Sequence, residues 1–280
     1  MNGTTPAEPK SAMKVLEETS RTFYIPISYL PDTIREAVGS AYLCLRAIDE
    51  VEDHPTLDNA IKAKILREIS FTIQKSTAES TAEDLTPNWY GQEANLPEVS
   101  LRIGEWCLFC PKDIAERVWE ATAAMADRMA FWAERNFEVE TKQDLDAYTY
   151  SVAGAVGLLL CDLWAWYEGV KTDRHLAVAF GRGLQATNIL RNKGEDKDRG
   201  VTFYPKGWTD KDMHEYARAN LNLGELYKQS LPEGSAAITF CKIPLALAVG
   251  TLNILEQGKE KLERAEVVSI VKSCLGVGAK

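Results

Sequence analysis

Three charged residues in the first part of the chain are spaced so that they share one face of a helix. Arg46, Asp49 and Asp53 lie in the run RAIDEVED, and residues three or four apart are neighbours on a helix surface. Two carboxylates at this spacing repel one another and mildly destabilise an isolated helix. The pair therefore indicates either a solvated helix face or a site that binds a divalent cation.

A second polar stripe lies in the run QATNILRNKGED, where Asn188, Asn192 and Asp196 follow one another at intervals of four. Mg²⁺ prefers oxygen ligands and commonly combines a few carboxylates with waters and substrate phosphate oxygens. Two facing helices with such stripes would hold a metal–diphosphate cluster, and neighbouring arginines and lysines would neutralise the remaining charge. The alternative for Asn188 and Asn192 is a polar helix face that caps a neighbouring loop.

Two glycines interrupt a segment that is otherwise strongly helical. Gly154 and Gly157 lie in the run VAGAVG, and each costs about 1 kcal/mol relative to alanine inside a helix. Such glycines permit close helix contact or open a break where a ligand approaches. Tyr148 lies one turn earlier, so the segment could form an apolar tunnel wall with a polar tip near its mouth.

The elements that must position these residues are predicted to be helices, because helical periodicity recurs along the chain and strand alternation is almost absent. Prolines and capping residues indicate where they begin and end. The expected helices cover residues 33–53, 58–75, 111–140, 142–168, 172–197, 210–230, 234–264 with a kink at Pro244, and 265–275. Residues 76–97 are expected to be a surface loop. The prediction is one all-α domain of about eight to ten helices, with no linker that divides it.

The composition narrows the function classes. The chain has 280 residues, and 32 Lys+Arg against 41 Asp+Glu give a formal net charge of −9. Nucleic-acid binding proteins are usually basic, so no nucleic-acid partner is expected. An anionic substrate would need local arginines and lysines or a bridging divalent cation.

Membrane and cysteine patterns are also informative. The longest apolar run, residues 152–161, is shorter than the roughly 18 residues of a membrane span, and the start of the chain lacks a signal peptide pattern.

The six cysteines are too sparse for a disulfide scaffold. They are expected to be buried or half-buried free thiols in a cytoplasmic protein, rather than a zinc or redox site.

With these motifs in order, the sequence resembles the squalene/phytoene synthase family, whose members join two prenyl diphosphates head to head. The resemblance extends from about Ser20 to the C-terminus, with residues 1–19 as a polar tail and the start of the first helix. It implies an isoprenoid synthase-type helical bundle around a central cavity, formed by residues 20–280. Its motifs are SRTFY at 20–24, Tyr42 with RAIDEVED at 46–53, YTYSVAGAVG at 148–157, and QATNILRNKGED at 185–196 followed by Arg199 and Gly200.

The resemblance implies a role for each motif residue. The residues that would hold Mg²⁺ and diphosphate are Asp49, Asp53, Asn188 and Asp196. The residues with catalytic roles would be Tyr42, Arg46, Tyr148 and Phe203, with both tyrosines beside the developing carbocation. The residues that would bind substrate are Ser20, Arg21, Phe23, Val152, Gly154, Gly157, Gln185, Arg191 and Asn192. In the family, ionisation is followed by attack of the second substrate's double bond, which gives a cyclopropyl intermediate that rearranges.

Three positions depart from the family pattern. Asn192 stands where the second motif usually has aspartate, and a neutral amide attracts a divalent cation less strongly. Phe203 stands where a tyrosine hydroxyl is expected, with Tyr204 one residue along. A tyrosine common in the C-terminal helix has no obvious counterpart in residues 243–251.

The leading hypothesis is a Mg²⁺-dependent prenyltransferase that couples two farnesyl or geranylgeranyl diphosphates to a squalene-, dehydrosqualene- or phytoene-type product. A single-substrate terpene cyclase or prenyl diphosphate phosphatase is the alternative that Asn192 and Phe203 favour, and a non-enzymatic assembly factor is a third. The short C-terminal helix and an apolar product favour peripheral rather than spanning membrane contact. NADPH use has no supporting motif, and the sequence leaves it open together with substrate length and oligomeric state.

Overall fold

A computed structural model describes residues 8–276 of the chain. The chain divides in sequence at Phe137 and Glu138 into two compact units, which are described separately. The described residues form helices and connecting segments without any strand, so the all-α prediction is confirmed. The assignment of residues 20–280 to one domain stays a prediction.

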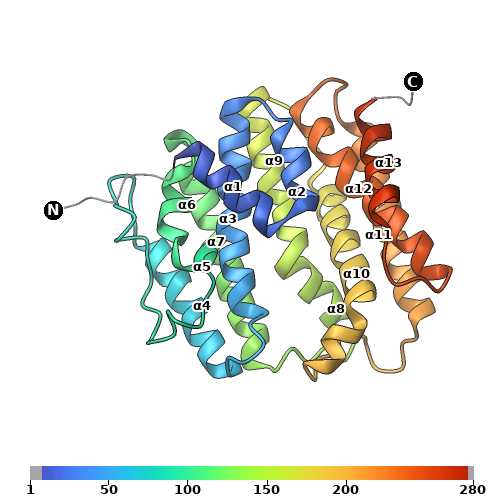
Figure 1. Cartoon of the computed structure of the whole chain (residues 1–280), viewed down its shortest axis with the longest axis horizontal. Helices are drawn as coiled ribbons and strands as arrows, with labels where there is room; N and C mark the ends of the chain where they lie inside the picture. The colour runs from blue at the N-terminus through green and yellow to red at the C-terminus, as the bar shows by residue number, and fades with distance from the viewer. Residues whose placement is uncertain (1–7, 277–280) are drawn as a thin grey trace. The chain divides into compact units, whose positions relative to one another are not determined.

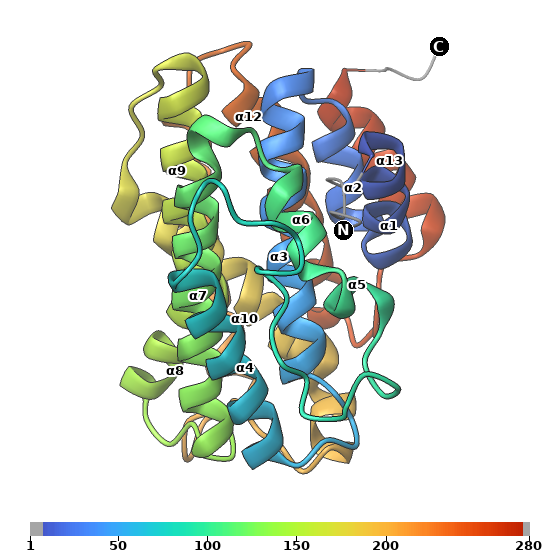
Figure 2. The same cartoon turned by 90° about the vertical axis from the view of Figure 1, so that its left-hand side faces the viewer.

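Unit 1 is organised around one long helix, α3, which packs against α1, α4, α5, α6 and α7. The antiparallel helices α4 and α7 lie side by side along most of their length (Figures 1 and 2). The helices of this unit are α1 (Pro9–Thr19), α2 (Arg21–Ser28), α3 (Asp32–Glu52), α4 (Asn59–Gln74), α5 (Glu98–Leu101), α6 (Ile103–Phe109) and α7 (Lys112–Glu134). Helices α2, α5 and α6 were not among those expected from the sequence, and α1 lies in the segment expected to be a polar tail leading into the first helix.

The boundaries in unit 1 follow from local chemistry. Pro31 precedes α3 at the N-cap position, and the Asp58 carboxylate accepts a hydrogen bond from the Ala60 amide at the start of α4 at 2.8 Å, as capping residues do. Helix α7 was expected to reach residue 140 but ends at Glu134. Asn136 and Phe137 have φ values of 53° and 56°, a left-handed backbone that cannot continue an α-helix.

Unit 2 is organised around α10, which packs against α8, α9, α11 and α12. Its most extensive contact is with α11, and α13 packs on α12. The elements are α8 (Lys142–Thr149), the π-helix η1 (Tyr150–Gly154), α9 (Ala155–Glu168), α10 (Arg174–Asp198), α11 (Asp210–Ser230), α12 (Ala236–Glu256) and α13 (Arg264–Leu275).

Two expected helices of unit 2 differ from the structure. The segment 142–168 is not one α-helix, because a turn of π-helix at Tyr150–Gly154 separates α8 from α9. Short π-helical turns inside helices often occur at functional sites. The helix expected over 234–264 ends at Glu256, where Gly258 adopts a φ of 79°. Helix α12 is continuous through Pro244.

Glycines on both sides of the contact allow α10 to pack closely against α9 and η1. A Cβ atom on Gly157 would lie 2.3 Å from the Ala177 carbonyl oxygen, and one on Gly181 would lie 2.4 Å from the Ala153 carbonyl oxygen. Both distances are far shorter than a van der Waals contact. Of the two roles that the sequence allows for Gly157, the structure supports close helix contact.

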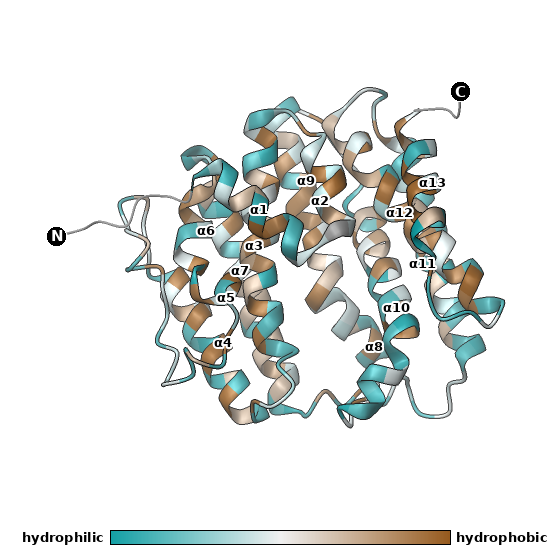
Figure 3. Ribbon diagram, in the orientation of Figure 1, coloured by the Kyte–Doolittle hydropathy of each residue, from teal (hydrophilic) through white to brown (hydrophobic). Residues whose placement is uncertain are grey.

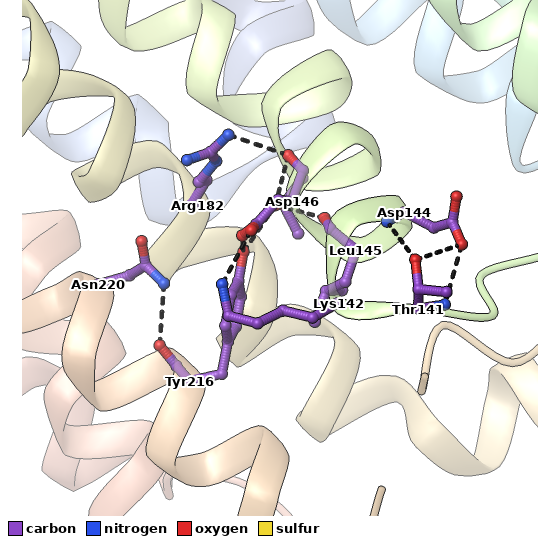
Figure 4. A network of polar contacts seen from close by, with 9 residues as sticks. Thr141, Lys142, Asp144, Leu145, Asp146, Arg182, Tyr216 and Asn220 are labelled. Carbon is purple, nitrogen blue, oxygen red and sulfur yellow. Dashed lines mark hydrogen bonds and ion pairs between the residues drawn. The ribbon is translucent and has the colours of Figure 1, made fainter. Parts of the chain in front are cut away.

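A polar network joins α8, α10 and α11 beside η1 (Figure 4). The Tyr216 hydroxyl donates to Asp146 Oδ1 at 2.8 Å and lies 3.1 Å from Thr149 Oγ1. Lys142 pairs with the other Asp146 carboxylate oxygen at 2.9 Å, and Arg182 of α10 donates to the Asp146 carbonyl at 3.2 Å. These contacts fix the last turn of α8, which carries Tyr148.

Two helical stretches are long and apolar enough by length and composition to cross a membrane, Lys142–Glu168 and Ala236–Glu256. No membrane-spanning segment was expected from the sequence, because neither stretch contains an uninterrupted run of apolar residues of that length. In the most apolar 18-residue windows, 39% and 56% of the residues are buried, and the core helix of a soluble protein passes the same test. Figure 3 shows apolar residues along α9 and polar residues at the last turns of α10.

Candidate functional site

The first acidic patch lies on the last turns of α3 in unit 1. Arg46, Asp49 and Glu50 are half-buried there, and Asp53 is exposed at the C-cap. The Arg46 guanidinium donates to Asp49 Oδ2 at 2.6 Å and also pairs with Glu50. One arginine therefore pairs with two carboxylates, so this pairing leaves an excess of negative charge.

This excess of negative charge affects the pKa of Asp49. Burial and the neighbouring Asp53 carboxylate raise the pKa of Asp49 to about 7, against the opposing effect of Arg46. The Asp49 side chain is still 33% exposed, so water reaches it and screens part of this effect. A carboxylate pair that disfavours its own charge in this way fits a divalent cation, which would replace the missing positive charge.

Aromatic residues of the first motifs lie next to this patch. The rings of Phe23 and Tyr42 are 5.7 Å apart and tilted by 40°. Ser20 caps α2 by accepting a hydrogen bond from the Phe23 amide at 3.2 Å. Burial raises the pKa of the Tyr42 hydroxyl, while Ser20 and Arg46 act in the opposite direction. Unit 1 thus brings Ser20, Phe23 and Tyr42 together with the acidic patch.

The second patch lies on the last turns of α10 in unit 2. Asn188 and Asn192 are half-buried, and Asp196 is buried, being 6% exposed. Two of these residues already pair with arginines: Asp196 pairs with Arg199 at 2.6 Å, and the Asn192 amide oxygen accepts from Arg191 Nε at 3.0 Å. This patch fits a divalent cation less well than the α3 patch does, because its one stripe carboxylate is neutralised.

Tyr148 and Phe203 form a direct contact in unit 2. Their rings stack at a centroid distance of 4.4 Å and an interplanar angle of 15°, and both side chains are buried. Phe203 therefore takes an aromatic packing role beside Tyr148. The neighbouring Tyr204 hydroxyl donates to Asp210 Oδ1 at 2.9 Å.

The remaining expected residues are spread along η1, α9 and α10. Val152 is buried within η1, and a Cβ on Gly154 would approach Val178 to 3.2 Å. Gln185 is half-buried on α10, one turn before Asn188, and Arg191 is exposed. The side chain of Arg21 lies outside the described part of the structure.

Two acidic residues that belong to these clusters, Glu50 and Asp210, were not expected from the sequence to have a role. Glu50 pairs with Arg46, and its spacing of four residues from the arginine could have indicated this. Asp210 pairs with Lys193 at 2.5 Å. The two residues are 17 positions apart in the sequence, and no pattern there could have predicted the contact.

Within residues 8–276, no group of three or more His, Cys, Asp and Glu side chains is arranged as a complete metal site. The cysteines are free thiols, five of them buried and Cys274 half-buried, as expected. A Mg²⁺ ion on the α3 patch would need further oxygen ligands from water and from substrate phosphate, which is its usual coordination.

Comparison with known proteins gives consistent results. The chain is 29% identical over 302 residues to squalene synthase of Schizosaccharomyces pombe, covering 95% of this chain and 65% of that protein. It is 28% identical over 312 residues to squalene synthase of Rattus norvegicus, covering 96% and 70%, and 31% identical over 292 residues to that of Eremothecium gossypii, covering 93% and 65%. The chain thus spans about two thirds of the length of these relatives.

Solved structures share the fold. A complex of TcSQS with the ligand E5700 matches with a TM-score of 0.75 and 24% identity, over 94% of this chain and 84% of that chain. A dehydrosqualene synthase in complex with ligand matches with a TM-score of 0.62 and 20% identity, over 95% and 94%. The family model for squalene/phytoene synthase matches residues 16–215. This chain therefore belongs to the squalene/phytoene synthase family.

Proposed function

We propose that the protein is a Mg²⁺-dependent prenyltransferase that ionises farnesyl or geranylgeranyl diphosphate and couples two such molecules head to head. The observation that carries the proposal is the α3 patch, where Arg46 pairs with Asp49 and Glu50 beside the ring of Tyr42, and where Asp53 raises the pKa of Asp49. A packed scaffold would have no need for this excess of negative charge, which lowers stability.

The proposed metal ligands are Asp49 and Asp53 in unit 1, with Asn188 and Asp196 as further oxygen ligands in unit 2. Asp196 would have to share its carboxylate with Arg199, to which it is now paired. When bound, Mg²⁺ supplies positive charge that stabilises the departing diphosphate. Arg46 and Arg191 bind diphosphate oxygens, because guanidinium groups pair well with phosphate.

The proposed role of the aromatic residues is to surround the allylic cation. Tyr42 and Tyr148 present ring faces, which attract a cation, and Phe23 and Phe203 pack against them at 5.7 and 4.4 Å. Ser20, Arg21, Val152, Gly154, Gly157, Gln185 and Asn192 remain the proposed substrate-contacting set. For Gly157 this contact would be made by its backbone, since no side chain fits against α10.

Product analysis tests the proposal. Purified protein is incubated with farnesyl or geranylgeranyl diphosphate, with and without Mg²⁺ and NADPH, and the products are identified by gas chromatography–mass spectrometry. A thirty- or forty-carbon hydrocarbon that forms only with Mg²⁺ is the expected result. The effect of NADPH on the product would show whether the reaction includes a reductive step.

A single-substrate reaction is the second candidate, and the observation that favours it is the second patch. The neutral Asn192 and the Arg199-paired Asp196 would bind a second metal-bound diphosphate less firmly. A fifteen- or twenty-carbon alcohol or cyclic hydrocarbon in the same experiment would establish this reaction and contradict head-to-head coupling.

For the location, we propose a cytoplasmic protein that contacts a membrane peripherally, since an apolar product must partition into lipid. The two long apolar helices lie partly within the core of their unit, which suits peripheral rather than spanning contact. Co-sedimentation with lipid vesicles tests this: high salt or alkaline washing should release the protein, and resistance to both would indicate a membrane span.

A further inference from the structure

Tyr148 lies where a short α-helix changes into a turn of π-helix. It is the next-to-last residue of α8, and η1 begins at Tyr150. The carbonyl groups of the three residues before it each accept a hydrogen bond from a side chain: Leu145 from Thr149 at 2.7 Å, Asp146 from Arg182 at 3.2 Å, and Ala147 from Ser151 at 2.8 Å. Such side-chain donors compete with the backbone donors of a helix and can bend it. The backbone around Tyr148 therefore depends on side-chain contacts for its conformation.

One tyrosine of α11 holds the backbone on both sides of Tyr148 (Figure 4). The Tyr216 hydroxyl donates to Asp146 Oδ1 at 2.8 Å and lies 3.1 Å from Thr149 Oγ1. Asp146 lies two residues before Tyr148, and Thr149 follows it directly. Burial raises the pKa of the Tyr216 hydroxyl, so this group remains a proton donor at neutral pH.

The segment between α10 and α11 contacts both tyrosines. Phe203 stacks on the Tyr148 ring at a centroid distance of 4.4 Å, and Trp208 meets the Tyr216 ring at 5.9 Å and an angle of 60°. Tyr148 and Tyr216 are 3% and 7% exposed. The ring of Tyr148 is thus held by Phe203, and its backbone is held by a tyrosine that is itself packed in place.

We propose that Tyr216 is a positioning residue for Tyr148, which acts through its hydrogen bond to Asp146. The role of Tyr148 beside a cation rests on the proposed function, whereas the hold on its backbone does not. The ion pair of Asp146 is secondary, because its partner Lys142 is 59% exposed and exposed ion pairs contribute little.

Steady-state kinetics with prenyl diphosphate test the proposal. Tyr216→Phe removes the hydroxyl and keeps the ring that packs against Trp208. It should lower kcat about tenfold to a hundredfold, as a small misplacement of a reacting group does, and leave KM unchanged. Asp146→Asn keeps an oxygen that accepts from Tyr216 and should retain the activity, whereas Asp146→Leu should be as impaired as Tyr216→Phe.

Tyr227→Phe is the matched control. Tyr227 lies further along α11, is 2% exposed, and its hydroxyl lies 3.7 Å from the Cys161 thiol. The variant loses a hydroxyl that is equally buried, so a general loss of folded protein would affect it as much as Tyr216→Phe. Equal kcat values for the two variants would overturn the proposal, as would an Asp146→Asn variant as impaired as Asp146→Leu.

Amide hydrogen exchange tests the hold on Tyr148 without any measurement of activity. In Tyr216→Phe the amides of residues 145–154 should exchange about fivefold to tenfold faster, the effect of one lost hydrogen bond, and in Tyr227→Phe their rate should not change. Unchanged exchange in Tyr216→Phe would overturn the proposal. Faster exchange in a protein that forms no prenyl product would contradict the proposed function and leave the hold on Tyr148 standing.

Discussion

Asp49 is disfavoured in its charged form by burial and by the neighbouring carboxylate of Asp53, which together raise its pKa to about 7. In an unfolded chain this pKa would be near 3.9. The folded protein therefore binds more protons than the unfolded chain between these two values, and stability falls as pH rises through that window. Above about pH 7 Asp49 is ionised in both the folded and the unfolded protein, and the full loss of folding stability is present.

Asp49→Asn should therefore stabilise the metal-free protein, with an advantage that grows from about pH 4 to pH 7 and stays constant above it. Because the side chain is 33% exposed, solvent screening reduces the gain to about 1–2 kcal/mol, or roughly 2–4 °C. Thermal unfolding in EDTA at pH 4, 6 and 8 measures this. An unchanged or lower midpoint at pH 8 would contradict the electrostatic reading of the patch.

Asp53→Ala should abolish turnover and leave the fold intact. Asp53 is exposed at the C-cap of α3, so its side chain adds little packing, whereas a metal ligand is indispensable to ionisation. Activity should fall by about a hundredfold or more, with an unchanged far-ultraviolet circular dichroism spectrum. Glu116→Ala, which removes an exposed carboxylate on α7, is the matched control; equal activities in the two variants would remove the case for a metal at α3.

At the level of elements, the sequence predicts best the helices whose ends carry a chemical signal. Asp58 and Asp173 cap α4 and α10, close to where these helices were expected to begin. Helices α5 and α6 are only 4 and 7 residues long, too short for a periodic pattern to be recognised. The π-helical turn was not predicted either; it lies between the α8 network and the close approach of α10.

The glycine positions give a prediction at this scale. Gly157→Ala should destabilise the protein by about 1–3 kcal/mol, since the new Cβ would meet the Ala177 carbonyl oxygen at 2.3 Å and force α9 from α10. Gly194→Ala in α10 meets nothing within 4 Å and should stabilise it by up to about 1 kcal/mol. Urea unfolding of both variants measures the difference, and a neutral Gly157→Ala would contradict the packing role.

For the molecule as a whole, the sequence motifs identify which residues belong to the candidate site but not how each is partnered. Spacing along one helix predicts the Arg46–Asp49 contact. It cannot predict the stacking of Tyr148 on Phe203 or the pairing of Lys193 with Asp210, because these contacts depend on tertiary packing. The contact between Asp196 and Arg199 is of the predictable kind, because the two residues are three apart in the sequence.

The two patches lie in different units, and the proposed reaction draws on residues of both. A ligand that contacts both patches couples them thermodynamically. Loss of its contacts at one patch therefore weakens the protection of backbone amides from hydrogen exchange at the other. With Mg²⁺ and an unreactive prenyl thiodiphosphate, amide hydrogen exchange should slow in α3 and α10 with one shared concentration midpoint. Asp53→Ala should raise the α10 midpoint in Mg²⁺ by about tenfold, the loss of one metal-bridged contact. Two separate midpoints in the unaltered protein, or an α10 midpoint unmoved by Asp53→Ala, would mean that the patches serve different ligands.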